Sequence, residues 1–129
     1  VSGRRLWGLF SERFESAENF FTNHYVVNHC PLVFMEETGK NRTPDKLSSS
    51  EAEALMKVCD EHLYKVVETL EPNWVIAVGT FAEKRAIIAL DNLDINIGKI
   101  LHPSPANPAS NKGWAAQANA KLRELGVWN

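Results

Sequence analysis

The stretch from Leu101 to Trp114 places the tightest limit on how this chain can fold. An apolar run ends at Leu101, His102 follows, and then come three prolines: Pro103, Pro105 and Pro108. Proline has no N–H and a fixed φ, so none of the three can continue a sheet ladder or a helix. Each also favours an extended conformation in the residue before it. We therefore predict that residues 103–113, here called the proline loop, form a stiff loop at the end of a strand. His102 lies at its root, and ligands of open α/β sheets bind at the carboxyl ends of strands.

Apolar residues at helical spacing predict four or five helices along the chain. Two of them begin at capping boxes, Ser48-x-x-Glu51 and Thr80-x-x-Glu83. A capping box satisfies free N–H groups at the start of a helix, so each box marks an N-terminus. The first of these helices ends before Pro72, and the second is expected to reach Asp91.

Two shorter helices are expected near the start of the chain, and a last one after the proline loop. Ser2 and Ser16 are the candidate N-caps of the shorter helices. The first carries an apolar face on Leu6, Trp7 and Phe10, and the second ends near Phe21. The last helix stops at Gly126, and its predicted apolar face consists of Trp114, Ala115, Ala118, Leu122 and Leu125.

Three strands are predicted between these helices. β-Branched and aromatic residues around Tyr25–Val27 favour a strand that Pro31 ends or bends. Trp74–Val78 is a short continuous apolar run, which is typical of a strand covered on both faces. The third strand covers residues 96–101. Strands separated by helices imply right-handed crossovers and a parallel sheet, so we predict one α/β domain over residues 1–129.

Composition limits the class of protein. A chain of 129 residues forms one domain, and 44% hydrophobic and 23% charged residues are ordinary for a soluble globular protein. No apolar run approaches the roughly 20 residues of a membrane span, so we expect no membrane association. The net charge of −2 argues neither for nor against nucleic acid. Acidic residues gather between Asp45 and Glu71, which leaves room for a basic surface elsewhere.

The cysteines suggest a reducing compartment and no metal. Cys30 and Cys59 are the only two, and we expect them to be unpaired. Cys59-x-x-His62 together with His29-Cys30 contains the right atoms for zinc, but the spacing is loose for a zinc site. A buried, apolar cysteine is the favoured interpretation.

Each candidate functional residue also has a structural interpretation when it is taken alone. His102 would be a packed histidine at a strand end, and Asn28 an amide in a turn or bulge. An amide buried among apolar residues needs partners, because leaving it unsatisfied costs about 1–3 kcal/mol. Lys112, Arg4 and Arg5 would be solvated surface charges. The proline loop itself would be a connector between a strand and a helix.

The order of residues 102–114 is nevertheless specific. His-Pro-Ser-Pro-x-Asn-Pro-x-x-Asn-Lys-Gly-Trp resembles the second signature motif of the uracil-DNA glycosylase superfamily. Its Asn-Lys-Gly-Trp ending is similar to the single-strand-selective monofunctional branch. Residues 27–32, Val-Asn-His-Cys-Pro-Leu, resemble the uracil-reading strand of that family. Residues 80–83, Thr-Phe-Ala-Glu after a Val-Gly strand end, are also similar, and we interpret them as structural.

The resemblance implies a fold and a reaction. The fold would be a three-layer α/β/α sandwich with a parallel sheet. The reaction would be hydrolysis of the N-glycosidic bond of uracil and related modified pyrimidines, in single- and double-stranded DNA, as a step of base-excision repair. By the same resemblance the enzyme would be a monofunctional hydrolase, active in the nucleus as a monomer, with no metal or other cofactor.

The resemblance also assigns roles to residues. Cleavage produces an anionic base, so a hydrogen-bond donor must face its carbonyl oxygen in a site that excludes water; His102 takes this role. A carboxamide both accepts from uracil N3–H and donates to O4, and Asn28 takes that role. The base must leave its stack, and a rigid loop can wedge the helix open. The DNA-binding residues would be Pro103, Ser104, Pro105, Ala106, Asn107, Pro108, Ala109, Ser110, Asn111, Lys112 and Gly113.

Two departures from the family pattern affect these expectations. Ala106 stands where vertebrate members have an arginine that helps fill the gap left by the flipped base. The first motif, a Gly-x-Asn-Pro-Gly type segment that positions the attacking water, does not occur in residues 1–129. In the family, the strand leading to that motif is a central strand, between the strand of Asn28 and Trp74–Val78. We therefore expect an incomplete sheet and an N-terminally truncated domain, loosely packed and inactive when residues 1–129 are expressed alone.

Two other classes of function stay open. One is a non-catalytic DNA-binding remnant, or inactive fragment, of the enzyme that keeps the proline loop. The other is an unrelated α/β interaction domain. Glycosylase assays separate an enzyme from a remnant, and the salt dependence of DNA binding separates a remnant from an unrelated domain.

Overall fold

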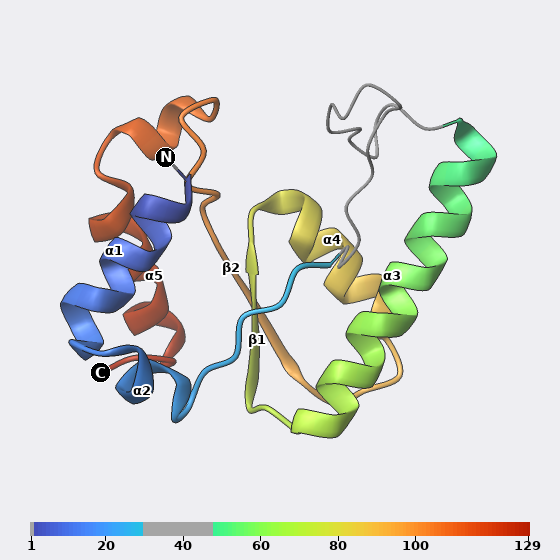
Figure 1. The fold of residues 1–129 in the computed structure, drawn as a ribbon, viewed down its shortest axis with the longest axis horizontal. Coiled ribbons are helices and arrows are strands. Elements are labelled where there is room, and N and C mark those ends of the chain that lie inside the picture. The colour runs from blue at the N-terminus through green and yellow to red at the C-terminus, as the bar shows by residue number, and fades with distance from the viewer. Residues whose placement is uncertain (1, 30–47) are drawn as a thin grey trace.

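A computed structural model describes residues 2–29 and 48–129 of the chain. Cys30 and Pro31 therefore lie outside the described residues, whereas His29 lies within them. The elements in chain order are α1 (Ser2–Phe14), α2 (Ala17–Phe21), α3 (Ser49–Leu70), β1 (Trp74–Val78), α4 (Thr80–Ala89), β2 (Asn96–Ile100), the 3₁₀ helix η2 (Pro108–Asn111) and α5 (Trp114–Leu125) (Figure 1).

The two strands form a parallel sheet that has helices on both sides. β1 pairs with β2 in the register Trp74↔Asn96 to Val78↔Ile100, and α4 makes the crossover between them. Figure 1 shows α1 and α5 on one side of the sheet and α3 and α4 on the other. The α/β class and the parallel pairing are confirmed, and the sheet is incomplete as expected.

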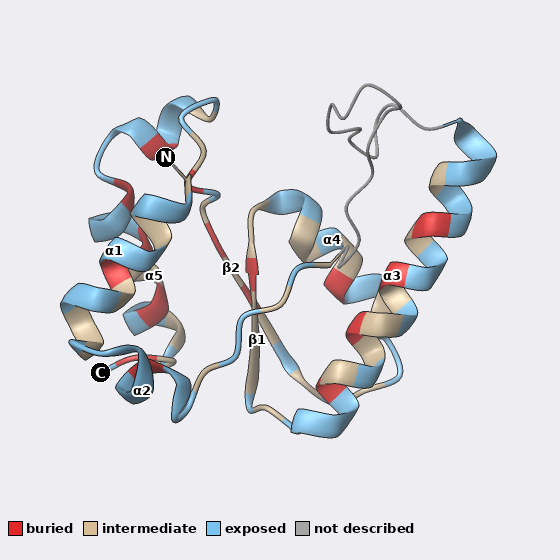
Figure 2. Ribbon diagram, in the orientation of Figure 1, coloured by how far each residue is buried: buried red, intermediate tan, exposed pale blue. Residues whose placement is uncertain are grey.

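Each face of the sheet packs on its own hydrophobic cluster, and Figure 2 shows the buried positions on both sides. On the α1 and α5 side, Ile76 and Val78 of β1 contact a cluster that includes Leu9 and Trp114. On the other side, Val75 contacts a cluster formed by Leu63, Val67, Ala86 and Leu90. Because alternate residues of β1 face opposite clusters, the prediction that Trp74–Val78 is covered on both faces is confirmed.

The predicted strand around Tyr25–Val27 is wrong for the described residues. Residues 24–28 have no regular secondary structure, and Tyr25 and Val26 are 64% and 41% exposed. Val27 packs against the same hydrophobic cluster as Val75. A strand needs a neighbouring backbone for its N–H and C=O groups, and the described sheet contains β1 and β2 alone. Strand propensity indicates a suitable side-chain pattern but does not supply that neighbour.

Most helix ends agree with their local signals. The Ser16 hydroxyl accepts a hydrogen bond from the Asn19 N–H at 3.1 Å, and the Ser48–Glu51 capping box forms at the start of α3. The predicted box at Thr80 is wrong, because Gly79 is the N-cap of α4 and makes no side-chain cap. Lys99 instead contacts the Thr80 hydroxyl, with Nζ 3.5 Å from Oγ1. α4 also ends at Ala89, two residues before the predicted Asp91.

The last helix buries a narrower face than predicted. Trp114, Ala118 and Leu122 are buried, whereas Ala115 is exposed. Gly126 ends α5 with φ +86°, which confirms the predicted stop because glycine adopts this left-handed conformation without strain.

Candidate functional site

The candidate site lies where β1 and β2 end. β1 continues through Gly79 into α4, and β2 continues through Leu101 and His102 into the proline loop. The side chain of His102 is exposed to solvent. Its Nδ1 accepts a hydrogen bond of 3.0 Å from the Ser104 N–H. Since Nδ1 is an acceptor, the proton of the neutral ring is on Nε2, which is thus available as a donor.

The proline loop is tied together by its own polar side chains. Ser110 is 1% exposed, and its hydroxyl lies 2.6 Å from the Ser104 carbonyl oxygen and 2.8 Å from that of Asn107. Asn111 donates to the Pro105 carbonyl at 2.9 Å. The Asn107 side chain caps η2 by accepting from the Ala109 N–H. These bonds cross-link the loop, as the predicted stiffness requires.

One part of the loop differs from the sequence prediction. Pro108 begins the short 3₁₀ helix η2 instead of continuing an extended segment. At the first helical position, the missing N–H of proline has no intrahelical partner to lose, and its fixed φ suits the helix. The prolines therefore shape the loop at Pro108 as well as stiffen it.

Arg5 of α1 forms hydrogen bonds to the proline loop, a contact that the sequence did not predict. Its Nη1 donates to the Pro103 carbonyl at 2.9 Å and contacts the Ser110 hydroxyl at 3.1 Å and carbonyl at 3.4 Å. Its Nη2 donates to the Asn111 Oδ1 at 3.0 Å. The partners lie about a hundred positions away along the chain, and no local pattern indicates such a contact. Arg5 is thus a loop clamp and not a solvated surface charge, whereas Arg4 is exposed.

Trp114 anchors the other limb of the loop. Its side chain is 3% exposed, and its Nε1–H donates to the Leu101 carbonyl at 2.5 Å. The indole therefore links the start of α5 to the end of β2, directly before His102. A buried indole needs such a partner for its N–H.

The predicted DNA-binding residues of the loop fall into three groups by exposure. Pro103 and Ser110 are buried and face the protein, so they support the loop. Ser104 and Asn107 are half-buried. The exposed remainder, which is available to a partner, comprises Pro105, Ala106, Pro108, Ala109, Asn111, Lys112 and Gly113.

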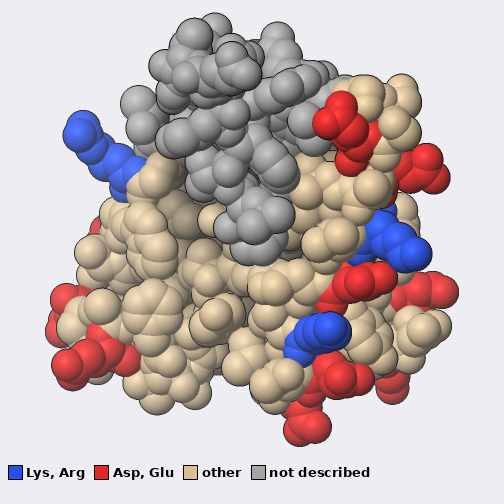
Figure 3. Space-filling view, turned by 45° about the vertical axis from the view of Figure 1, so that its right-hand side comes forward, with Lys and Arg blue, Asp and Glu red and all other residues tan. Residues whose placement is uncertain are grey.

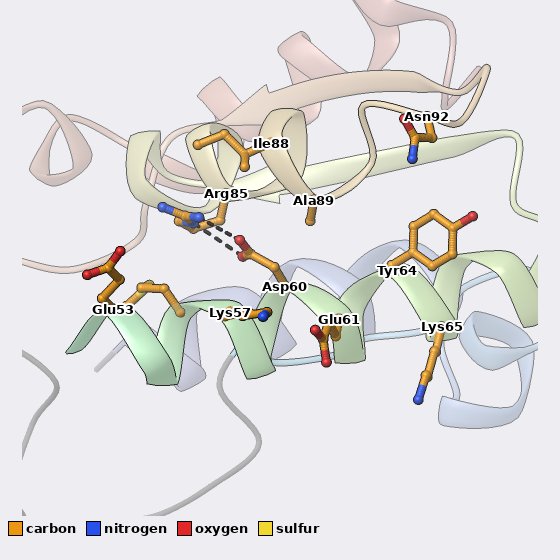
Figure 4. Close-up of a pocket in the computed structure, with 11 residues that line it drawn as sticks. Glu53, Lys57, Asp60, Glu61, Tyr64, Lys65, Arg85, Ile88, Ala89 and Asn92 are labelled. Carbon is orange, nitrogen blue, oxygen red and sulfur yellow. Dashed lines mark hydrogen bonds and ion pairs between the residues drawn. The ribbon is translucent and has the colours of Figure 1, made fainter. Parts of the chain in front are cut away.

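Asn28 is exposed, and its neighbour His29 is anchored. His29 Nε2 lies 2.7 Å from Asp60 Oδ1 of α3. Asp60 also receives two hydrogen bonds from Arg85 of α4, at 3.2 Å and 2.5 Å, which Figure 4 shows bridging the two helices. Burial opposes ionisation of Asp60, but the hydrogen bonds from Arg85 and His29 outweigh it and lower the pKa of Asp60 below its ordinary value of 3.8. The segment carrying Asn28 is therefore fixed to both helices.

The start of α4 lies near His102 and near the neighbour of Asn28. The ring of His29, next to Asn28, lies edge-on to Phe81 with centroids 5.9 Å apart. Two residues earlier, a Cβ placed on Gly79 would lie 3.1 Å from the Cβ of His102. His29 and His102 therefore lie beside the same three-residue segment, 79–81.

A groove of about 760 Å³ lies between α3 and α4, and Asp60 and Arg85 are part of its lining (Figure 4). Its lining mixes both charges, among them Glu53, Lys57, Glu61 and Lys65, and includes neither Asn28 nor His102. Figure 3 shows acidic and basic side chains interspersed on that side of the molecule. The surface over α3 therefore lacks the uniform positive charge that favours a nucleic-acid backbone.

The candidate zinc ligands do not gather in the described part of the chain. Residues 2–29 and 48–129 contain no group of three side chains suited to a metal ion. Cys59 is fully buried on the core side of α3, which agrees with the apolar interpretation. Among the same residues, no helix is long and apolar enough to span a membrane.

Comparison with known proteins identifies the class that this arrangement defines. Residues 1–123 match the Uracil DNA glycosylase superfamily, so the chain belongs to that superfamily. Among curated proteins, the single-strand selective monofunctional uracil DNA glycosylase of Bos taurus is 42% identical over 98% of this chain. The Rattus norvegicus protein of that name is 40% identical over 98% of it. The matches cover 47% and 46% of those proteins, so the chain spans about half the length of the curated relatives it matches.

Proposed function

We propose that the protein is a monofunctional uracil-DNA glycosylase, and that residues 1–129 supply its base-reading and anion-stabilising groups. The observation that carries the proposal is the hydrogen bond from the Ser104 N–H to His102 Nδ1. It fixes the ring as an Nε2–H donor at the carboxyl end of β2, at the root of a stiff loop. The names of the relatives support the same activity.

His102 would act on the leaving base. As the N-glycosidic bond breaks, negative charge develops on the uracil ring and its carbonyl oxygen. A preorganised donor at that oxygen stabilises the transition state more than the ground state, which is what accelerates the reaction. Because Nδ1 accepts the Ser104 N–H, the neutral imidazole carries its proton on Nε2, which is the donor that this role requires.

Asn28 would select the base. Its carboxamide accepts from uracil N3–H through Oδ1 and donates to O4 through Nδ2. Cytosine presents an acceptor at N3 and a donor at C4, so it would oppose both groups. The link from His29 to Asp60 limits movement of the Asn28 backbone, and its exposure leaves the amide free to meet a flipped base.

The exposed residues of the proline loop would contact DNA. The loop is clamped by Arg5 and Trp114, and a clamped loop can hold a duplex open without deforming. Lys112 lies on its exposed side and suits a phosphate contact. We propose that the protein acts on single- and double-stranded DNA and on related modified pyrimidines, as a nuclear monomer in base-excision repair.

A non-catalytic DNA-binding remnant is the alternative, because residues 1–129 contain no Gly-x-Asn-Pro-Gly segment and carry Ala106 in the loop. Both functions predict DNA binding that weakens with salt. The separating experiment measures uracil release from single-stranded DNA by the full-length protein and by residues 1–129 alone. Release by the full-length protein supports the enzyme. DNA binding without release by the full-length protein supports the remnant.

A further inference from the structure

A side chain on Gly79 would crowd His102. Gly79 follows β1, and its N–H donates to the Ile100 carbonyl at 2.9 Å, which extends the pairing of the two strands by one step. A Cβ placed on Gly79 would lie 3.1 Å from Cβ, 3.3 Å from Cδ2 and 3.5 Å from Cγ of His102. These are the three atoms nearest to that position. Because carbon atoms in contact prefer about 3.5–4.0 Å, a side chain at residue 79 would push the imidazole away.

We propose that Gly79 is a positioning residue for His102: the absence of its side chain lets the imidazole lie against the strand end and sets the direction of Nε2–H. Two features set the position of the imidazole. Gly79 leaves the space beside Cβ, Cγ and Cδ2 of His102 free of a side chain, and the Ser104 N–H holds Nδ1. A displaced ring loses the hydrogen bond from Ser104, because that bond depends on the position of Nδ1. The catalytic consequence rests on the proposed function, whereas the positioning itself does not.

The backbone conformation of residue 79 could by itself explain why glycine is required there. Its φ of +93° is a conformation that side-chain-bearing residues rarely adopt, so Gly79→Ala is strained whether or not it touches His102. Gly126 provides a control for positive φ. It ends α5 with φ +86° and ψ 9°, and a Cβ placed on it would meet nothing within 4 Å. Both variants place alanine at a positive φ, but the ψ of 166° at Gly79 makes the strain there the larger of the two. The His102→Leu background therefore separates this strain from the contact with His102.

The test compares the full-length parent protein with these two variants by ¹⁵N NMR of the histidine side chains. The parent and Gly126→Ala are expected to show His102 as the Nε2–H tautomer. Gly79→Ala is expected to show a mixture with the Nδ1–H tautomer, because the Ser104 bond is weakened. His24, which is distant in the chain and bonded to the Phe20 carbonyl through Nδ1, serves as an internal reference that should not change.

Excision kinetics on single-stranded uracil DNA provide the second measurement. A displacement of the donor by a few tenths of an ångström should lower kcat by about tenfold or more and leave KM nearly unchanged, since a misplacement of about 1 Å can cost roughly 10²-fold. In a His102→Leu background the same Gly79→Ala change should have no further effect on kcat, because residues that act as a unit are not additive.

Three results would overturn the proposal: an unchanged His102 tautomer in Gly79→Ala, an equal change in Gly126→Ala, or a full Gly79→Ala effect on kcat without His102. A parent protein that releases no uracil is a different result. It contradicts the proposed function, while the NMR comparison still decides whether Gly79 positions His102.

Discussion

Replacing Arg5 with methionine tests whether α1 holds the proline loop in place. Methionine keeps an unbranched apolar stem but has no N–H groups, so Arg5→Met removes the contacts to Pro103, Ser110 and Asn111. Arg4→Met is the matched control. It removes the same charge from the neighbouring position, where the side chain is exposed.

The size of the effect follows from the contacts. A hydrogen bond to a charged group contributes about 1.5–3 kcal/mol net, and Arg5 is half-buried, which favours the lower part of that range. Its bonds share one guanidinium and do not add independently. We therefore assign to Arg5 a total contribution of about 2 kcal/mol to the free energy that favours the closed loop over the open loop. At 1.4 kcal/mol for each factor of ten, Arg5→Met should raise the open fraction of the loop roughly thirtyfold.

Native-state hydrogen exchange measures this fraction directly. The Asn107 N–H donates to the Ser104 carbonyl and the Ser110 N–H to the Asn107 carbonyl, each at 3.0 Å. Both amides should exchange roughly thirtyfold faster in Arg5→Met, because local opening controls their exchange, and at the parent rate in Arg4→Met. Equal rates in the two variants would refute the clamp.

Three further predictions concern Asn28, the Asp60 network that anchors its neighbour, and the proline loop. Asn28→Asp should shift preference away from uracil in assays that compare uracil with hydroxymethyluracil and cytosine, because a carboxylate cannot donate to O4; an unchanged preference removes Asn28 from the site. Asp60→Asn should be less stable than the parent at neutral pH. Because the folded-state pKa of Asp60 is lowered from 3.8, its carboxylate stabilises the folded parent above about pH 4. In thermal melts, the stability difference between the parent and Asp60→Asn should therefore shrink as the pH falls below 4. A stability difference that stays constant down to pH 3 contradicts the ion pair. Borohydride added during turnover should trap no protein–DNA adduct, and an adduct lost in Lys112→Ala would make the enzyme bifunctional.

Local signals predicted the elements whose causes are local. The Ser48–Glu51 box, the apolar run Trp74–Val78 and the Gly126 stop each depend on residues within a few positions, and the structure agrees with all three. The Thr80 box is the exception. At that position Gly79 is the N-cap with a positive φ, and Lys99 from the neighbouring strand contacts the Thr80 hydroxyl.

Features that depend on distant parts of the chain were less predictable. The strand around Tyr25–Val27 requires a neighbouring backbone, which side-chain pattern does not reveal. Arg5 reaches residues about a hundred positions away, and Gly79 meets His102 from the adjacent strand. The motif at 102–114 located the candidate site, whereas the contacts that support it come from α1, α3 and α4.

His102→Leu tests the central claim, that this histidine stabilises the departing base, most directly. Single-turnover release of uracil from single-stranded DNA is measured for the full-length parent and variant, together with DNA binding. Removing one preorganised donor should lower the excision rate by at least about 10², while DNA binding changes little because His102 lies outside residues 103–113, the loop proposed to contact DNA. An excision rate within a few-fold of the parent would contradict the claim and leave His102 a structural residue.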